Sequence, residues 1–185
     1  MIPGKPSLLR RLFGGAAKPE VTTERRRGPR VNAREGTRVL IIDDSNTIIA
    51  VLGKMLRQNG YQTVAAVDAE TGIETARSER PDLIFLDIVL PGMNGFAALR
   101  ILRREEPTRD IPVIMMSGNM QATEQFYAQR IGADDFLKKP FPRAELFAKI
   151  TRLLDADRIP KRPAQAATPE GAMPEVVGEP NPPTD

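Results

Sequence analysis

The stretch "VLIIDDS", Val39 to Ser45, places four aliphatic residues directly before two adjacent carboxylates. A short run that is apolar at every position is typical of a strand buried on both faces of a parallel sheet. The two carboxylates stand where this strand would end. Open parallel sheets bind their ligands in the crevice outside the carboxyl ends of the strands. The stretch therefore predicts a buried strand that leads into a functional site.

Four further segments have the same strand character: "TVAAV" (63–67), "LIFLD" (83–87), "VIMMS" (113–117) and "DFLK" (135–138). Between the segments, apolar residues recur at the spacing of helices that pack on a sheet, at Ile48, Leu52, Met55 and Leu56 and again at Leu146, Ile150, Leu153 and Leu154. Gly60 and Gly132 follow expected helix ends, and Pro142 stands at an expected helix start. Strict alternation of strand and helix predicts βαβ units with right-handed crossovers. We therefore expect a doubly wound α/β sandwich with five parallel strands.

Composition excludes several kinds of chemistry. The 185 residues contain no Cys and no His, so disulfides, thiolates and imidazole ligands are absent and any metal must be held by oxygen. No apolar run approaches the ~18–20 residues that span a bilayer, and the N-terminus lacks the apolar core of a secretory signal. We therefore expect a cytoplasmic protein. A formal net charge of +3 is too small to indicate nucleic-acid binding by the whole molecule.

The chain divides into three parts. Residues 1–36 are rich in Arg, Gly and Pro and predict a basic, disordered arm. Residues 156–185 are dominated by Pro, Ala and Glu and predict a disordered tail. The folded domain is expected over 37–155. Within the arm, "PSLLRRLFGG" (6–15) is either part of the disordered segment or a short docking peptide or membrane-surface anchor.

Polar side chains gather at the expected strand ends. Asp43 and Asp44 follow the first strand, Asp87 and Ser117 end the third and fourth, and Lys139 follows the fifth. Two unit charges about 4 Å apart repel by about 4 kcal/mol at an effective dielectric near 20, so three carboxylates require a cation among them. With oxygen ligands only, the matching ion is Mg²⁺ or Mn²⁺, which usually serves phosphate chemistry. Together with Lys139, such a site would clamp a transferring phosphoryl group.

Each of these residues also has an ordinary structural interpretation. An Asp-Asp pair after a strand usually caps a helix, and Asp44 or Ser45 can do so here. Ser117 alone is typical of a turn, and Lys139 alone of a solvated surface. Their joint occurrence at sister strand ends favours the functional interpretation over the structural one.

Four motifs resemble the motif set of the response-regulator receiver domain, the CheY-like superfamily of two-component signalling: "IIDDS", "LIFLDIVLPGMNGF", "VIMMSGN" and "DFLKKPF". They occur in order, at strand ends, and the resemblance covers about Thr37 to Leu154. It implies a (βα)5 flavodoxin-like sandwich with a five-stranded parallel sheet in the order 2-1-3-4-5. We expect no second domain after Leu154, and the chain resembles single-domain regulators of chemotaxis and type IV pilus twitching motility.

The resemblance assigns a role to each residue of the site. Asp87 would be the phosphorylated aspartate. Asp43 and Asp44 would bind Mg²⁺ (or Mn²⁺) together with Asp87 and the backbone carbonyl of Val89. Asn119 and Val89 would stand at positions that tune the lifetime of the phosphoryl group.

Three further residues would respond to the phosphoryl group. Ser117 would be the switch hydroxyl, and Lys139, which directly precedes Pro140, would be the lysine that contacts phosphate, with a cis bond before Pro140. Phe136 would be the aromatic switch residue, with packing in the core as the alternative.

The function implied is that of a stand-alone response regulator. It would accept phosphate from a histidine kinase or phosphotransfer protein and bind a target through the face of the fourth helix, fifth strand and fifth helix. Chemotaxis or type IV pilus twitching motility would be the process, and the chain would be a monomer or weak dimer. It would not be an enzyme beyond self-phosphorylation from small donors and autodephosphorylation. The alternatives are a phosphate sink for a kinase and a magnesium-dependent phosphatase of the haloacid-dehalogenase kind, whose Asp-x-Asp motif is absent from "DDS".

Overall fold

The computed structural model describes residues 32–118 and 122–163, which form a five-stranded parallel sheet with five helices. The elements follow one another in strict alternation: β1 (Arg38–Ile42), α1 (Asn46–Arg57), β2 (Gln62–Ala66), α2 (Ala69–Glu79), β3 (Leu83–Asp87), α3 (Gly95–Arg104), β4 (Val113–Ser117), α4 (Ala122–Arg130), β5 (Asp135–Lys138) and α5 (Arg143–Arg152). The strand order is β2-β1-β3-β4-β5. The predicted fold and strand order are confirmed, and the first two strands lie one residue earlier than predicted.

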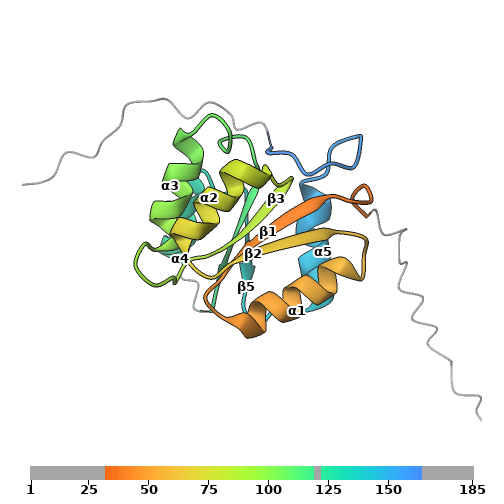
Figure 1. Cartoon of the computed structure of the whole chain (residues 1–185), viewed down its shortest axis with the longest axis horizontal. Coiled ribbons are helices and arrows are strands. Elements are labelled where there is room, and N and C mark those ends of the chain that lie inside the picture. Colours follow the sequence, from red (N-terminus) through yellow and green to blue (C-terminus); the bar gives the residue numbers. More distant parts are fainter. Residues whose placement is uncertain (1–31, 119–121, 164–185) are drawn as a thin grey trace, which may run out of the picture. The chain divides into compact units, whose positions relative to one another are not determined.

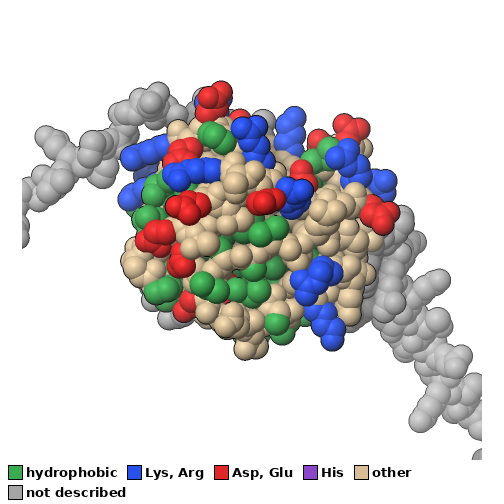
Figure 2. Space-filling model, in the orientation of Figure 1, with side chains coloured by type: hydrophobic (Ala, Val, Ile, Leu, Met, Phe, Trp, Pro, Cys, Tyr) green, Lys and Arg blue, Asp and Glu red, His purple; other side chains and the backbone are tan. Residues whose placement is uncertain are grey.

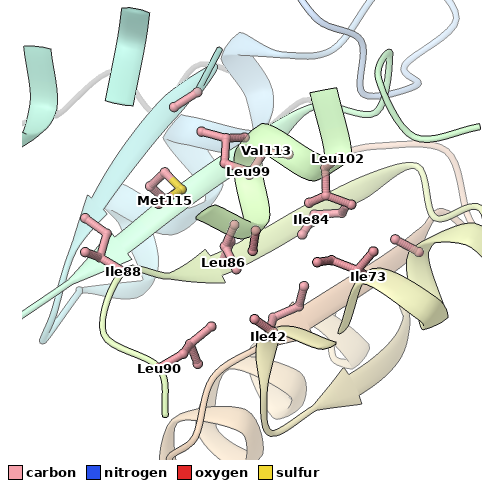
Figure 3. Packing of buried hydrophobic residues seen from close by; sticks show 14 of the residues in the cluster. Ile42, Ile73, Ile84, Leu86, Ile88, Leu90, Leu99, Leu102, Val113 and Met115 are labelled. Carbon is pink, nitrogen blue, oxygen red and sulfur yellow. The ribbon is translucent and has the colours of Figure 1, made fainter. Parts of the chain in front are cut away.

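Helices cover both faces of the sheet (Figure 1). Residues of α2, α3 and α4 pack on one face with Leu40 and Ile42 of β1, and residues of α1 and α5 pack on the other with Val39 and Ile41. Figure 3 shows the first of these clusters, in which Ile84 and Leu86 of β3 lie among side chains of the neighbouring elements. Because successive strand residues point to opposite faces, both of which are buried, the central strands β3 and β4 are apolar up to their last residues, Asp87 and Ser117.

Local chemistry fixes the helix ends. The side chain of Ser45 accepts a hydrogen bond from the backbone of Ile48 at the start of α1, and Asn94 does the same for Ala97 at the start of α3. Gly60, after α1, has a φ of 83°, a left-handed conformation that glycine adopts without strain. Such caps allow the chain to turn within a few residues between sheet and helix.

The chain continues along the domain after α5. Leu154 and Pro160 form an antiparallel bridge, and the backbone of Lys161 donates to the carbonyl of Leu153 at 2.7 Å. The predicted tail begins at residue 156, yet residues 156–163 pack against the domain through these contacts. The remainder of that tail, residues 1–31 of the predicted arm, and the peptide 6–15 lie outside the described residues.

Charged side chains of both signs are interspersed on the surface shown in Figure 2, in keeping with the small net charge. Within residues 32–118 and 122–163, no helix is long and apolar enough to cross a membrane.

Candidate functional site

The parallel register brings the predicted site residues to one edge of the sheet. Ile42 pairs with Leu86 and Ala66, so the residues that follow these strands meet at their carboxyl ends. On the other side of β3, Asp87 pairs with Met116 of β4. The backbone of Lys139 donates to the carbonyl of Ser117 at 2.8 Å, which fixes the start of the β5–α5 loop beside β4.

Three carboxylates converge at this edge. Asp43, Asp44 and Asp87 each offer one oxygen, and these atoms all lie within 4.8 Å of one another. Asp43 and Asp87 are buried, whereas Asp44 is exposed. The backbone of Ser45 donates to Asp43 Oδ1 at 3.0 Å, and Asp43 Oδ2 is buried against Nζ of Lys139 at 2.6 Å. The cluster therefore places three carboxylates close enough together to bind one cation.

Lys139 supplies the positive charge at the centre of the cluster. Its Nζ lies 2.6 Å from Asp43 Oδ2 and 2.8 Å from Asp87 Oδ2. Burial lowers the pKa of Lys139, but the hydrogen bonds and charges of the two aspartates together outweigh burial and raise this pKa above its ordinary value. The amine is therefore a permanent cation at neutral pH.

Asp87 is held in an environment that favours its neutral form. Burial is the main influence and raises the pKa of Asp87 above its ordinary value, and the nearby charge of Asp43 acts in the same direction. Lys139 and a hydrogen bond from the backbone N–H of Val89 lower this pKa, but not enough to cancel burial. One lysine does not compensate for three clustered carboxylates.

The sequence interpretation missed Gly95, which positions Asp87. Its backbone donates to the carbonyl of Ile88 at 2.9 Å. A Cβ on Gly95 would overlap the carbonyl oxygen of Asp87 and lie 2.9 Å from the carbonyl carbon. The start of α3 thus lies so close to the end of β3 that only glycine fits at position 95. The signal was present in "PGMNG", where a glycine follows the capping residue Asn94.

The other predicted residues occupy distinct places. Ser117 is the last residue of β4 and is buried, and Val89 is 71% exposed beside the cluster. Phe136 is buried within the core on the face covered by α2, α3 and α4, and pairs in register with Met115. The Lys139–Pro140 peptide bond is cis. Asn119 lies outside the described residues. The structure thus brings the three aspartates and Lys139 together, with Ser117 at the end of the adjacent strand.

Residues 39–151 match the response regulator receiver domain family. This chain belongs to that family. It is 40% identical over 117 residues to protein PilH of Pseudomonas aeruginosa, a match that covers 63% of this chain and 97% of PilH. Transcriptional regulators such as RpaA of Synechocystis are also similar, and the chain matches about half of their length.

Solved structures agree with this assignment. The chemotaxis protein CheY4 of Vibrio cholerae is 27% identical with a TM-score of 0.62, over 64% of this chain and 99% of CheY4. The receiver domain of the sensor histidine kinase PA1611 of Pseudomonas aeruginosa is 32% identical with a TM-score of 0.59, over 63% of this chain and 96% of that domain. The PA1611 structure has a magnesium ion coordinated in its active-site cleft.

The acidic cluster fits a divalent cation on its own chemistry. Carboxylate oxygens are the ligands that Mg²⁺ prefers, and one or two carboxylates with several waters complete its octahedral shell. The convergence of the three carboxylates and the solvent exposure of Asp44 meet the two needs of such a site, protein oxygen ligands close together and access for water.

Proposed function

We propose that this receiver domain accepts a phosphoryl group on Asp87 from a histidine kinase or phosphotransfer protein, with Mg²⁺ as cofactor, and signals by docking to another protein. The observation that carries the proposal is the contact of one lysine, Lys139, with both Asp43 and Asp87 inside a cluster of three carboxylates. A structural ion pair would balance its charges, whereas this cluster retains an excess of carboxylate.

In the proposed reaction, an oxygen of Asp87 attacks the phosphorus of a phosphohistidine on the donor. The phosphorus–nitrogen bond breaks as the new phosphorus–oxygen bond forms, which leaves an acyl phosphate on Asp87 and returns the imidazole to the donor. The donor must be another protein because this chain contains no His. Lys139 holds Asp87 in place and offers its charge to the phosphoryl oxygens.

Asp43, Asp44, Asp87 and the carbonyl of Val89 would hold the magnesium ion. When bound, the ion neutralises the charge that collects on the phosphoryl oxygens. Residues of the chain hold Asp87 in place for the reaction. The Val89 N–H donates to the Asp87 carboxylate, and Gly95 packs closely against the backbone carbonyl of Asp87.

Phosphorylation would change the surface made by α4, β5 and α5. The phosphoryl group adds close to two negative charges and strong acceptor oxygens, to which the Ser117 hydroxyl would donate. Movement of β4 at Ser117 would alter the packing around Phe136, which lies on the adjacent strand β5. To move the equilibrium between the inactive and active conformations from 1:99 to 99:1, phosphorylation would have to favour the active conformation by about 5.5 kcal/mol.

The proposed output is a protein–protein contact in the cytoplasm, made by a monomer or weak dimer that acts alone. The proposed process is chemotaxis, which similarity to the chemotaxis protein CheY4 supports, or type IV pilus twitching motility. Turnover would be limited to self-phosphorylation from small donors and autodephosphorylation.

Incubation with acetyl phosphate and Mg²⁺, followed by mass spectrometry of intact protein and peptides, tests the proposal. We expect the mass of one phosphoryl group on the peptide that contains Asp87. Asp87→Asn should abolish this gain. Asp68→Asn is the matched control because asparagine also caps a helix, so it preserves α2 and should leave the gain unchanged. A phosphoryl group that persists in Asp87→Asn would move the acceptor elsewhere.

A further inference from the structure

The chain beyond α5 is tied to the amino-terminal edge of the sheet. Nε of Arg162 lies 2.9 Å from Oδ1 of Asp134, whose side chain is completely buried. The same guanidinium donates to the carbonyl of Arg109 at 3.1 Å. These contacts fix the point at Pro163 from which residues 164–185 leave the described domain.

Pro163 lies at one end of a surface groove between α4 and α5. The part of the groove at Pro163 has a volume of about 300 Å³ and is also lined by Gln129, Asp135, Arg152 and Leu153. The adjoining part, of about 290 Å³, shares Gln129 and Asp135 with the first. Its other lining residues are Gln125, Phe136, Lys138, Glu145 and Lys149. The groove therefore follows α4 and β5 away from Pro163.

The groove is lined by three cations, Lys138, Lys149 and Arg152, and three carboxylates, Asp134, Asp135 and Glu145. Ion pairs largely neutralise two of the carboxylates. Asp134 is already paired with two arginines, and Asp135 with Lys149 at 2.7 Å and Arg152 at 3.7 Å. Lys138 is exposed at the end of β5. Lys138 and Arg152, whose side chain is 71% exposed, are thus the groove cations that an anionic segment can contact.

Residues 164–185 have the complementary character. They contain Glu170, Glu175, Glu179 and Asp185 and no Lys or Arg. Their five prolines favour an extended backbone, which loses little conformational entropy on binding in a groove. At about 3.1 Å per residue, Glu170 can reach about 20 Å from Pro163. This exceeds the length of the nine-residue α4, about 13 Å.

We propose that residues 164–185 dock in the groove between α4 and α5 of the same molecule, with their glutamates toward Lys138 and Arg152. Attachment at Pro163 gives the segment a high effective concentration at the groove, so weak contacts are enough to hold it. The docked segment covers the surface assigned above to the output partner and competes with it. That consequence rests on the proposed function, whereas the docking itself does not require phosphorylation.

A paramagnetic label on the full chain tests the docking. The chain contains no Cys, so Ala172→Cys gives one attachment site for a nitroxide. We expect the backbone amide NMR signals of Gln129, Lys138 and Lys149 to lose most of their intensity while those of α1 keep theirs. The experiment uses no phosphodonor, so a failure of Asp87 to accept phosphate would not change its result.

Charge reversals provide the controls. Glu170→Lys, Glu175→Lys and Glu179→Lys in one labelled chain should restore the groove signals, and Lys138→Glu should restore them in part. Lys54→Glu, an exposed lysine of α1 that lines neither part of the groove, should have no effect. Absent or uniform broadening, or broadening that survives both kinds of reversal, overturns the proposal. Broadening only between differently labelled molecules would assign the groove to a second copy and likewise overturn docking within one chain.

Discussion

Two clusters of buried carboxylates and cations lie at opposite edges of the sheet. At the carboxyl edge, the buried Asp43 and Asp87 share Lys139, and the exposed Asp44 lies beside them. At the amino edge, the single carboxylate of Asp134 lies between Arg103, at 2.7 Å, and Arg162, at 2.9 Å. The two clusters use the same kinds of contact and differ in their balance of charge.

The amino-edge cluster is saturated. Oδ2 of Asp134 also accepts the backbone N–H of Val113 at 2.8 Å, and Arg103 donates to the carbonyls of Gly132 and Ile111. Burial lowers the pKa of Arg103 to about 10, which leaves it charged at neutral pH. Such a cluster holds loops together and has no spare ligand. The carboxyl-edge cluster has spare carboxylate oxygen, and this excess, rather than burial, marks it as the reactive site.

The largest expected effect is on the saturated cluster. Asp134→Ala would leave two largely buried guanidiniums unpaired and should lower the free energy of unfolding by about 3–5 kcal/mol. Urea denaturation measures this change. Asp110→Ala removes an aspartate that is 85% exposed in its pair with Arg109 and should cost ~0–1 kcal/mol. Equal costs for the two variants would contradict the contrast between a saturated buried cluster and an exposed pair.

Magnesium should act at the other edge. Mg²⁺ at 100 times its dissociation constant should stabilise the wild-type protein by about 2.7 kcal/mol. Asp43→Asn should remove most of this gain because it takes away a buried ligand, whereas Asp68→Asn should keep all of it. Thermal unfolding with and without Mg²⁺ checks the prediction, and equal stabilisation of Asp43→Asn and wild type would place the ion elsewhere.

The backbone behind Asp87 should tolerate no added side chain. Gly95→Ala introduces a Cβ that overlaps the carbonyl of Asp87, and we expect a loss of about 1–3 kcal/mol in the free energy of unfolding. Gly118→Ala is the matched control because a Cβ there would meet no atom within 4 Å among the described residues. Denaturant titration compares the two, and an unaltered Gly95→Ala midpoint would refute the role given to this close approach.

Removal of one carboxylate from the unbalanced cluster should stabilise the fold. Because the pKa of Asp87 is higher in the folded than in the unfolded protein, the neutral carboxyl group stabilises the fold. This stabilisation is fully present below the unfolded-state pKa of 3.8 and is lost as the pH rises through the folded-state pKa. At neutral pH the ionised Asp87 therefore destabilises the fold, so Asp87→Asn should raise the free energy of unfolding. The gain should shrink as pH falls toward 4. If Asp87→Asn were less stable than the wild-type protein at neutral pH, the attraction of Lys139 would outweigh the repulsion among the carboxylates, and this prediction would be wrong.

The two edges also differ in what the sequence reveals. Aliphatic runs that end in Asp43, Asp87 and Ser117 predict both strands and site, because strand ends of a parallel sheet meet wherever the strands do. The Asp134 cluster has no such signal: its partners come from α3 and from a Pro-rich segment without hydrophobic period. Gly95 was overlooked because its role lies in a tertiary approach of two backbones. Local pattern thus predicts elements and their ends, while long-range ion pairs and close contacts require the folded chain.

The central claim is that excess carboxylate at the carboxyl edge, and not at the amino edge, captures a divalent cation beside Asp87. Titration of the isotope-labelled protein with Mg²⁺, followed through backbone amide shifts, tests it most directly. We expect saturable shifts at Asp43, Asp44, Asp87 and Val89 and none at Asp134 or Val113. Shifts centred on Asp134, or no shift at the aspartates of the carboxyl edge, would contradict it.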